Sequence, residues 1–320
     1  MNSIQSSIIP LVSVIIPNFN HANYLDERIQ SVLNQSYRNF EVIILDDCSV
    51  DNSREIIEKY ASSPQISQII FNDQNSGSPF LQWKKGIKVA KGELIWLAES
   101  DDFCAPEFLN SLVLENSKYN TVLSFCRSVK IDVEGNVLPN PLQEKLVGDF
   151  VMDGHRFIRQ YLVDSNSIEN ASSVIFKRDV AMSLTDEYTS YRGAGDWVFW
   201  LQLCLKGNVS FLNTPLNYYR WHGNNTSIQE ADSGKQEKEN KRVYDFLFRN
   251  GVIDEKQYLS IRKMKLFFIL YNQKFDNKLK RELLELWDCN NRILIEIKVK
   301  KEFDRVKCLL GRILRKLRIR

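Results

Sequence analysis

The first hundred residues alternate short apolar runs with segments whose apolar positions recur every three or four residues. Four runs, at residues 12–16, 41–45, 69–71 and 94–98, are rich in β-branched and aliphatic side chains, which indicates buried strands. The segments between them, such as residues 81–90, have the apolar spacing of helices. Because strands and helices in regular alternation form crossover units, the pattern predicts an α/β domain built on a mostly parallel sheet flanked by helices.

The pattern changes along the rest of the chain. Further strands are predicted at residues 122–125, 173–176 and 209–212, with a helix at residues 197–205. Residues 231–242 are almost entirely polar, which indicates a loop or a solvated helix start, and the apolar spacing beyond them is helical. We therefore expect an α/β domain at residues 1–230 and a helical C-terminal region at residues 231–320.

Charge is balanced overall but not along the chain. The 43 Lys and Arg and 40 Asp and Glu give a formal charge of +3, so no nucleic-acid partner is expected. Eleven of the basic and three of the acidic residues lie in residues 291–320, which carry +8 and leave −5 for the rest. Apolar residues spaced among the cations of residues 298–320 predict an amphipathic helix on an anionic membrane surface. The alternative is a helix that packs on its own domain and exposes its basic face.

The spacing of the cysteines and the length of the apolar segments indicate where in the cell the protein is expected. The chain is 43% hydrophobic and 26% charged, as in soluble globular proteins, and its six cysteines are scattered without a Cys-x-x-Cys pair. This spacing argues against a zinc site or a disulfide framework and for a reducing compartment. No signal peptide is expected from residues 1–10, and no run approaches the roughly 18 apolar residues of a membrane-spanning helix. We expect a cytoplasmic protein that lies peripherally on the cytoplasmic face of the membrane.

Polar side chains follow three of the predicted strands, at the edge where open parallel sheets bind ligands. Residues 17–20 follow the first strand, Asp46 and Asp47 the second, and Glu99 and Asp101 the fourth. Carboxylates crowded on one edge repel one another unless a cation or hydrogen-bond donors compensate. Oxygen ligands suit Mg²⁺ or Mn²⁺, usually shared with a substrate phosphate. The alternative is that these acids only form turns and helix N-caps.

Three segments resemble glycosyltransferase family 2. They are SVIIPNFN (residues 13–20), VIILDDCSVD (42–51) and LAESDD (97–102), in that order and at those intervals, and the resemblance covers residues 11–225. It implies the GT-A fold, a Rossmann-like α/β sheet, and an inverting transferase of the bacterial cell-surface polysaccharide type. Such an enzyme moves a sugar from a nucleoside-diphosphate sugar to a hydroxyl of a glycan or lipid-linked acceptor.

The resemblance also assigns a nucleotide site. Phe19 stands where the family places an aromatic side chain near the base, and Pro17 and Asn20 frame that loop. Asp47 matches the family's acid that recognises the base. Cys48 follows it where the family usually has glycine, so this turn is expected to differ in shape.

A metal site is implied by the same resemblance. Glu99 and Asp101 occupy the Asp-x-Asp motif, whose last acid ligates the Mn²⁺ or Mg²⁺ that bridges the donor's diphosphate. Glu99 replaces the first Asp, so we expect it to reach the metal directly or through water. Arg220 and His222 lie in a segment that the family closes over the donor phosphates or the acceptor, and they are candidates to neutralise the leaving diphosphate. The alternative for His222 is a structural role.

Asp196 is the candidate general base. The segment GDWVFWL (residues 195–201) resembles the family's Glu-Asp motif, with Gly195 in place of Glu. An inverting reaction needs a base that deprotonates the acceptor hydroxyl opposite the leaving group. The alternative is that Asp196 only caps a helix that carries Trp197 and Trp200.

Two other functions stay open. One is a non-catalytic nucleotide- or glycan-binding module of the same fold. The other is a sugar nucleotidyltransferase, which needs a Gly-rich loop bearing Lys or Arg that residues 17–21 do not supply. The motifs of P-loop, dinucleotide-binding, serine-hydrolase and zinc-protease enzymes are absent. Transfer of one sugar is expected, because the sequence predicts no transmembrane helices that could thread a polymer.

Overall fold

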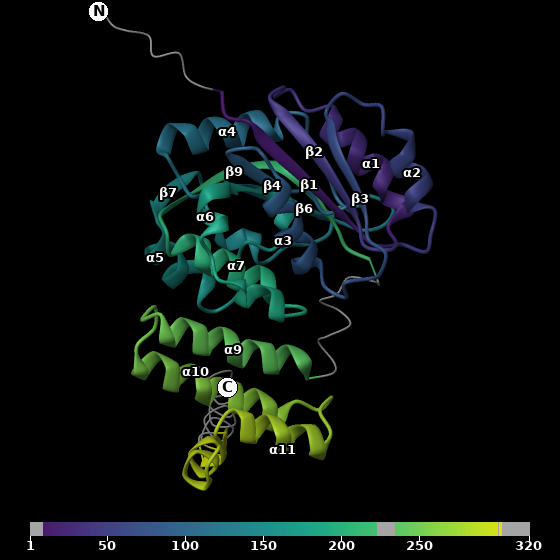
Figure 1. The fold of residues 1–320 in the computed structure, drawn as a ribbon. Helices are drawn as coiled ribbons and strands as arrows, with labels where there is room; N and C mark the ends of the chain where they lie inside the picture. The colour runs from purple at the N-terminus through teal and green to yellow at the C-terminus, as the bar shows by residue number, and fades with distance from the viewer. Residues whose placement is uncertain (1–8, 223–233, 300, 303–320) are drawn as a thin grey trace, which may run out of the picture. The chain divides into compact units, whose positions relative to one another are not determined.

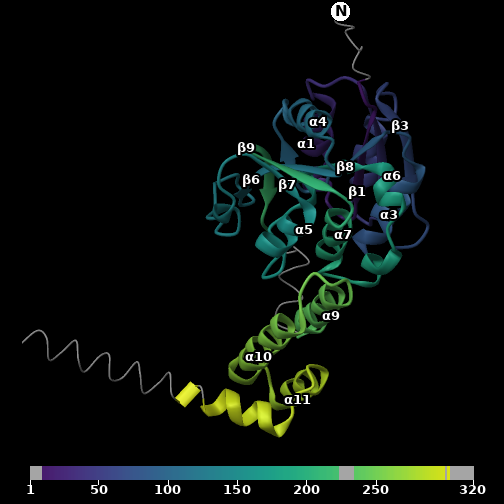
Figure 2. The same cartoon turned by 90° about the vertical axis from the view of Figure 1, so that its left-hand side faces the viewer.

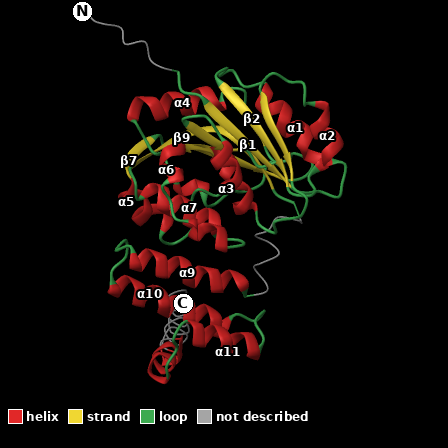
Figure 3. Ribbon diagram, in the orientation of Figure 1, coloured by secondary structure: helices red, strands yellow, loops and turns green. Residues whose placement is uncertain are grey.

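A computed structural model describes residues 9–222, 234–299 and 301–302. The chain divides into two compact units, Met1–Thr226 and Ser227–Arg320 (Figure 1). The first unit is an α/β domain and the second is helical (Figure 3). Each unit is described separately below.

The first unit is built on a nine-stranded sheet. Its strands are β1 (Val12–Asn18), β2 (Phe40–Asp46), β3 (Ile66–Phe71), β4 (Leu94–Leu97), β5 (Phe103–Cys104), β6 (Leu123–Ile131), β7 (Phe150–Asp153), β8 (Val174–Lys177) and β9 (Asn208–Arg220). The strand order is β3-β2-β1-β4-β8-β6-β9-β5, and β7 pairs with β9. The predicted α/β fold and its strands are confirmed. Pairing is parallel from β3 to β4, whereas β8 is antiparallel to both of its neighbours, so the second half of the sheet is mixed.

Helices cover both faces of this sheet (Figures 1 and 2). They are α1 (Ala22–Leu33), α2 (Ser53–Lys59), α3 (Pro79–Val89), α4 (Phe108–Tyr119), α5 (Gly154–Phe157), α6 (Arg178–Met182) and α7 (Gly195–Cys204). Successive residues of β1 serve opposite faces, as the period of a strand requires. Val14 packs in one core with Leu25 of α1 and Phe108 of α4. Ile15 contacts α3 at Gly86, where an added Cβ would lie 2.5 Å from its Cγ2.

The parallel strands bring the candidate residues to one edge. β1, β2 and β4 run side by side in the same direction, so residues 18–21, 46–51 and 98–102 all follow carboxyl ends. β9 reaches this edge too, because Tyr218 pairs with Phe103 of β5 directly after the third segment. The long strand β9 thereby delivers Arg220 and His222, distant in sequence, to the loop that carries Asp101.

The second unit contains α9 (Lys235–Arg249), α10 (Glu255–Tyr271) and α11 (Asn277–Leu286), and residues 291–299 are also helical. Leu247, Leu266, Leu283 and Trp287 form part of its buried interior. The polar segment predicted at 231–242 is a helix start from Lys235 onward. Within the described ranges no helix combines the length and apolar character needed to cross a bilayer. Most of the tail predicted to contact membrane, residues 303–320, lies outside the described residues.

Candidate active site

The loops after β1 and β2 are tied together by short hydrogen bonds. The Val50 amide donates to Asn20 Oδ1 at 2.8 Å, and the Asn20 amide donates to Ser49 Oγ at 2.9 Å. Asn18 Nδ2 donates to Asp46 Oδ1 at 2.8 Å. Phe19, at the tip of the first loop, is exposed, whereas Pro17 is buried within β1. The two loops therefore form one braced edge that presents the Phe19 ring outward.

Cys48 adopts an unusual backbone conformation in this edge. Its φ of 63° lies in the left-handed region, where glycine is strained least. The turn therefore holds a conformation that suits glycine, although the residue carries a side chain. That side chain makes one weak contact, from Sγ to the Asp73 carbonyl oxygen at 3.7 Å.

Replacing Cys48 by Gly is expected to stabilise the protein. Relief of left-handed strain contributes about 1–2 kcal/mol, and the added freedom of the unfolded chain removes about 0.5–1 kcal/mol, so the net gain lies between about 0 and 1.5 kcal/mol. Cys48→Val should be less stable than wild type, because a β-branched residue is strained most at positive φ. Urea unfolding of the three proteins checks the order Gly, Cys, Val, and a Gly variant less stable than wild type contradicts it.

Asp47 is buried and its carboxylate is engaged within the protein. Oδ1 accepts hydrogen bonds from Asn72 at 2.7 Å and Gln82 at 2.9 Å, and Oδ2 accepts one from Ser76 Oγ at 2.7 Å. The Ser76 amide contacts both oxygens. The residue predicted to recognise the base therefore fastens the segment before α3 to the end of β2, and contact of Asp47 with a base stays a prediction.

Asp101 lies beside two histidines. His222 Nε2 is 3.0 Å from Asp101 Oδ2, and the His21 and His222 rings are 5.7 Å apart. His21 Nδ1 is 2.8 Å from Ser100 Oγ. Burial acts to raise the pKa of Asp101, but the His222 hydrogen bond and the two imidazoles outweigh it and lower the pKa. Asp101 is thus held as a carboxylate next to two nitrogen ligands.

These three side chains fit a divalent cation. One ligand atom from each of His21, Asp101 and His222 lies within 4.8 Å of the others. Imidazole nitrogen favours transition metals, whereas Mg²⁺ prefers oxygen ligands and water. The donor set therefore suits Mn²⁺ better than Mg²⁺. No local pattern in the sequence marks His21, because the pairing of β1 with β4 is what brings it to Asp101.

Glu99 is directed to another part of the domain. Its Oε1 accepts a hydrogen bond from Trp83 Nε1 of α3 at 2.7 Å. Burial and the negative charge of Asp101 raise the pKa of Glu99 to about 8. Among the residues the structure describes, the group able to hold a metal consists of His21, Asp101 and His222 and does not include Glu99. A contact of Glu99 with a metal stays a prediction.

A buried ion pair between Arg28 and Asp102 stabilises the Asp101 loop. Asp102 accepts hydrogen bonds from Ser172 Oγ at 2.6 Å and from the Arg220 amide at 2.9 Å. The fully buried Arg28 guanidinium lies 3.8 Å from Asp102, and its Nε donates to the Glu99 carbonyl at 2.8 Å. Arg28 thus offsets part of the charge that three neighbouring acids place in this loop. Sequence reasoning missed Arg28 because it sits among the apolar positions of α1.

Arg220 has protein partners on both sides. Its Nη2 is 2.6 Å from Glu27 Oε2, and its Nε donates to the Asp101 carbonyl at 3.0 Å. The guanidinium is mostly buried and lies over the Tyr24 ring. Its present contacts fix the Asp101 loop to α1, and a direct contact of Arg220 with the leaving diphosphate stays a prediction.

Asp196 lies in the first turn of α7. Oδ1 accepts the Trp197 amide at 2.7 Å, and Oδ2 accepts Asn166 Nδ2 at 2.9 Å. The helix N-cap is Ala194, so the alternative that Asp196 merely caps the helix does not describe its position. Gly195 has no room for the family's Glu, because an added Cβ would lie 2.5 Å from the Phe80 ring. The helix N-terminus stabilises the negative charge of Asp196.

Tyr219 is a buried tyrosine of β9. This buried phenol lies where the charges of Asp102, Glu169, Asp101 and Asp196 all act on it, and burial followed by those charges raises its pKa. The Tyr219 phenol therefore stays protonated.

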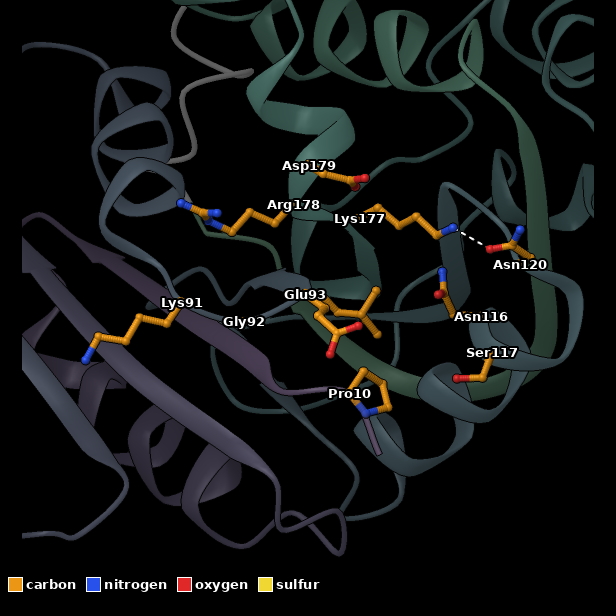
Figure 4. Close-up of a pocket in the computed structure, with 11 residues that line it drawn as sticks. Pro10, Lys91, Gly92, Glu93, Asn116, Ser117, Asn120, Lys177, Arg178 and Asp179 are labelled. Carbon is orange, nitrogen blue, oxygen red and sulfur yellow. Dashed lines mark hydrogen bonds between the residues drawn. The ribbon is translucent and has the colours of Figure 1, made fainter. Parts of the chain in front are cut away.

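A separate cavity of about 490 Å³ lies at the opposite ends of the strands (Figure 4). Its lining includes Pro10 and Glu93, which precede β1 and β4, and Lys177, which ends the antiparallel strand β8. Lys177 Nζ donates to Asn120 Oδ1 across its rim. This cavity is not part of the edge that carries Asp101.

Comparison with known proteins places the domain in a family. The model of glycosyl transferase family 2 matches residues 13–185, more than half of the chain. The putative teichuronic acid biosynthesis glycosyltransferase TuaG of Bacillus subtilis is 26% identical over 230 residues, which cover 71% of this chain and 85% of TuaG.

Two solved structures share the fold. TarS 1–349 of S. aureus, in complex with UDP-GlcNAc, is 19% identical with a TM-score of 0.55, covering 85% of this chain and 70% of TarS. The mannosyltransferase PcManGT of Pyrobaculum calidifontis, in complex with GDP-Man and Mn²⁺, is 14% identical with a TM-score of 0.56, covering 93% and 81%. At these identities the likeness concerns the fold.

Proposed function

The chain belongs to glycosyl transferase family 2 and is a glycosyltransferase that uses a nucleotide sugar, and we propose that it moves one sugar with inversion, using Asp196 as the general base. The observation that carries this proposal is that residues 166–170 bind both Asp196 and the loop of Asp101. Asn166 Nδ2 donates to Asp196 Oδ2 at 2.9 Å, and Asn170 Nδ2 donates at 2.9 Å to Asp102 Oδ2, next to the metal-binding group of two histidines and Asp101. A carboxylate and a metal-binding group are what a direct displacement needs, one for each side of the reacting carbon.

The donor is proposed to be a nucleoside-diphosphate sugar bound over the loops after β1 and β2. The exposed Phe19 ring offers a stacking surface for a base, and the hydrogen bonds of Asn20 and Asp46 keep that loop in place. The structural neighbours hold UDP-GlcNAc or GDP-Man, which supports this class of donor. We propose that the sugar is added to a polysaccharide precursor, as the name of the relative TuaG suggests.

His21, Asp101 and His222 are the proposed metal ligands. A bound Mn²⁺ or Mg²⁺ would supply positive charge that stabilises the departing diphosphate. Arg28 and Arg220 keep the Asp101 loop in position through its carbonyl oxygens and through Asp102. His222 is therefore assigned to the metal, and not to a separate contact with phosphate.

Asp196 is proposed to accept the proton of the acceptor hydroxyl. The hydroxyl oxygen forms a bond to the anomeric carbon while the bond from that carbon to the diphosphate oxygen breaks, and the proton passes to Asp196. Trp197 and Asn166 donate to this carboxylate and hold its orientation. Attack from the face opposite the leaving group inverts the anomeric configuration.

A direct experiment measures nucleoside diphosphate release from UDP-GlcNAc and GDP-mannose with Mn²⁺. We expect one of these sugar nucleotides to be turned over, faster when a glycan with free hydroxyl groups is added, and EDTA to stop the reaction. Transfer to that glycan with retention of the donor's configuration, read by NMR of the product, contradicts the proposed mechanism.

The acceptor is proposed to be lipid-linked and reached at the membrane through residues 298–320. This segment is rich in Lys and Arg, which anionic headgroups attract. We expect the protein to sediment with phosphatidylglycerol vesicles at low salt and not with phosphatidylcholine vesicles. A chain ending at residue 297 should lose this binding and keep its donor binding. Equal binding of both chains, or none by the full chain, contradicts the proposal.

A further inference from the structure

We infer that Asn166 is the positioning residue for Asp196, and that it lies in a segment that ties the base to the metal loop. The inference rests on the proposed function, since it assumes that Asp196 acts as the base. It concerns residues 163–170, an irregular stretch between the turn that ends at Leu162 and the next turn, Ala171–Ser173.

This segment forms hydrogen bonds both with Asp196 and with Asp102 in the Asp101 loop. Asn166 Nδ2 donates to Asp196 Oδ2 at 2.9 Å, and four residues later Asn170 Nδ2 donates to Asp102 Oδ2 at 2.9 Å. Ser172 Oγ donates to the same oxygen at 2.6 Å. The separation of the base from the Asp101 loop is therefore set by one short piece of chain. A segment that only filled space would not need a donor at each end.

The orientation of the Asn166 amide is fixed by chemistry. A carboxylate oxygen only accepts hydrogen bonds, so the atom that faces Asp196 has to be the amide nitrogen. The Trp197 amide occupies the other oxygen at 2.7 Å. Because each oxygen accepts at least one hydrogen bond, the plane of the carboxylate is held, which is what a base needs if it is to meet a proton in one direction.

The oxygen atom of the Asn166 amide is the second feature that points to a role at the site. Asn166 Oδ1 is buried and has no hydrogen-bond partner, and Glu169 Oε2, three residues on, is in the same state. A buried acceptor without a donor costs free energy unless a ligand or water supplies one. A sugar hydroxyl that approaches Asp196 would supply it. We therefore assign Asn166 two contacts, Nδ2 to the base and Oδ1 to a hydroxyl of the acceptor.

The test is a double-mutant cycle between Asn166 and Asp196. Turnover is measured as nucleoside diphosphate release from UDP-GlcNAc, with GDP-mannose as the second probe, in wild type, Asn166→Ala, Asp196→Asn and the double variant. We expect Asn166→Ala to lower kcat about 10- to 100-fold through misorientation of the base. The KM for the donor should stay within about twofold, because groups that act as one unit affect only the step they share.

The decisive result is how much turnover Asn166→Ala loses when it is made in the Asp196→Asn variant. If Asn166 positions Asp196, Asn166→Ala lowers kcat at saturating acceptor by less than about twofold once Asp196 is Asn, because the Oδ1 contact with the acceptor affects the KM for the acceptor. An equal loss in both backgrounds, or none in either, overturns the inference. Asn166→Asp keeps the shape and removes the donor, so it should lose as much as Ala and covers the case in which Ala fails to fold. Asp164→Asn, an exposed change in the same segment, should turn over as wild type.

Failure of the proposed function has a different signature. In that case Asp196→Asn itself keeps full turnover, and the inference falls with it. If Asp196→Asn loses turnover while Asn166→Ala does not, the base stands and only the role of Asn166 is wrong.

Discussion

Asp196→Asn is expected to lower the turnover of the sugar nucleotide by about 10²–10⁴-fold, the range that a general base contributes. The amide has nearly the shape of the carboxylate but cannot accept the proton of the attacking hydroxyl. Nucleotide binding should not change, because the proposed donor contacts lie on the loops after β1 and β2. Steady-state rates together with nucleotide-induced shifts in melting temperature measure the two effects separately.

A matched control is available for this variant. Asp179 also lies in the first turn of a helix, α6, but it is exposed and lines the cavity at the opposite edge of the sheet. Asp179→Asn should turn over as wild type. If Asp196→Asn keeps wild-type turnover, or if it abolishes nucleotide binding as well, Asp196 is not the base.

His222→Ala and His21→Ala are each expected to weaken Mn²⁺ binding by at least about 10–100-fold, the loss typical when even an outer partner of a metal site is removed. Each variant removes one of the three ligands and leaves Asp101 with one imidazole. Electron paramagnetic resonance of free Mn²⁺ measures this directly, without turnover. Donor turnover should fall in parallel, because the charge that stabilises the leaving diphosphate is lost.

The chain offers its own control, because it has three histidines. His155 in α5 is exposed and is not part of the metal-binding group, so His155→Ala should bind Mn²⁺ as wild type. If His21→Ala binds Mn²⁺ normally while His222→Ala does not, His21 is a neighbour of the site and not a ligand. Tight binding that instead depends on Glu99 would restore the ligand set expected from the Asp-x-Asp motif.

The sheet could be predicted because short apolar runs in the local sequence mark its strands. Residues 12–16 of β1 are apolar except for Ser13, and residues 42–45 of β2 are all apolar, because both strands are buried on both faces. Parallel order then placed the acids after β2 and β4 at one edge. The mixed half of the sheet was harder, because β8 has only four residues and its direction depends on both neighbours.

The details of the site depend on contacts between distant residues. Glu99 lies in the expected motif, but its carboxylate accepts a hydrogen bond from Trp83 of α3. His21 and Asn166 have no sequence signal, because each becomes relevant only through a partner far along the chain. Gly195 stands where the family motif has Glu, and the Phe80 ring leaves no room for a side chain at that position. Motif order could therefore name the family and the edge, whereas packing decides which side chains face the site.

The most direct test of the central claim, a metal-dependent nucleotide site built on Asp101, is the melting temperature with UDP, GDP, dTDP or CMP, each with and without Mn²⁺. Wild type and Asp101→Asn are compared. A ligand at one hundred times its Kd stabilises by about 2.7 kcal/mol, which corresponds to roughly 5–10 °C for a domain of this size. We expect one nucleotide to give such a shift only with Mn²⁺ in wild type, and Asp101→Asn to lose the metal-dependent part. No shift with any nucleotide, or the same shift in both proteins, contradicts the account.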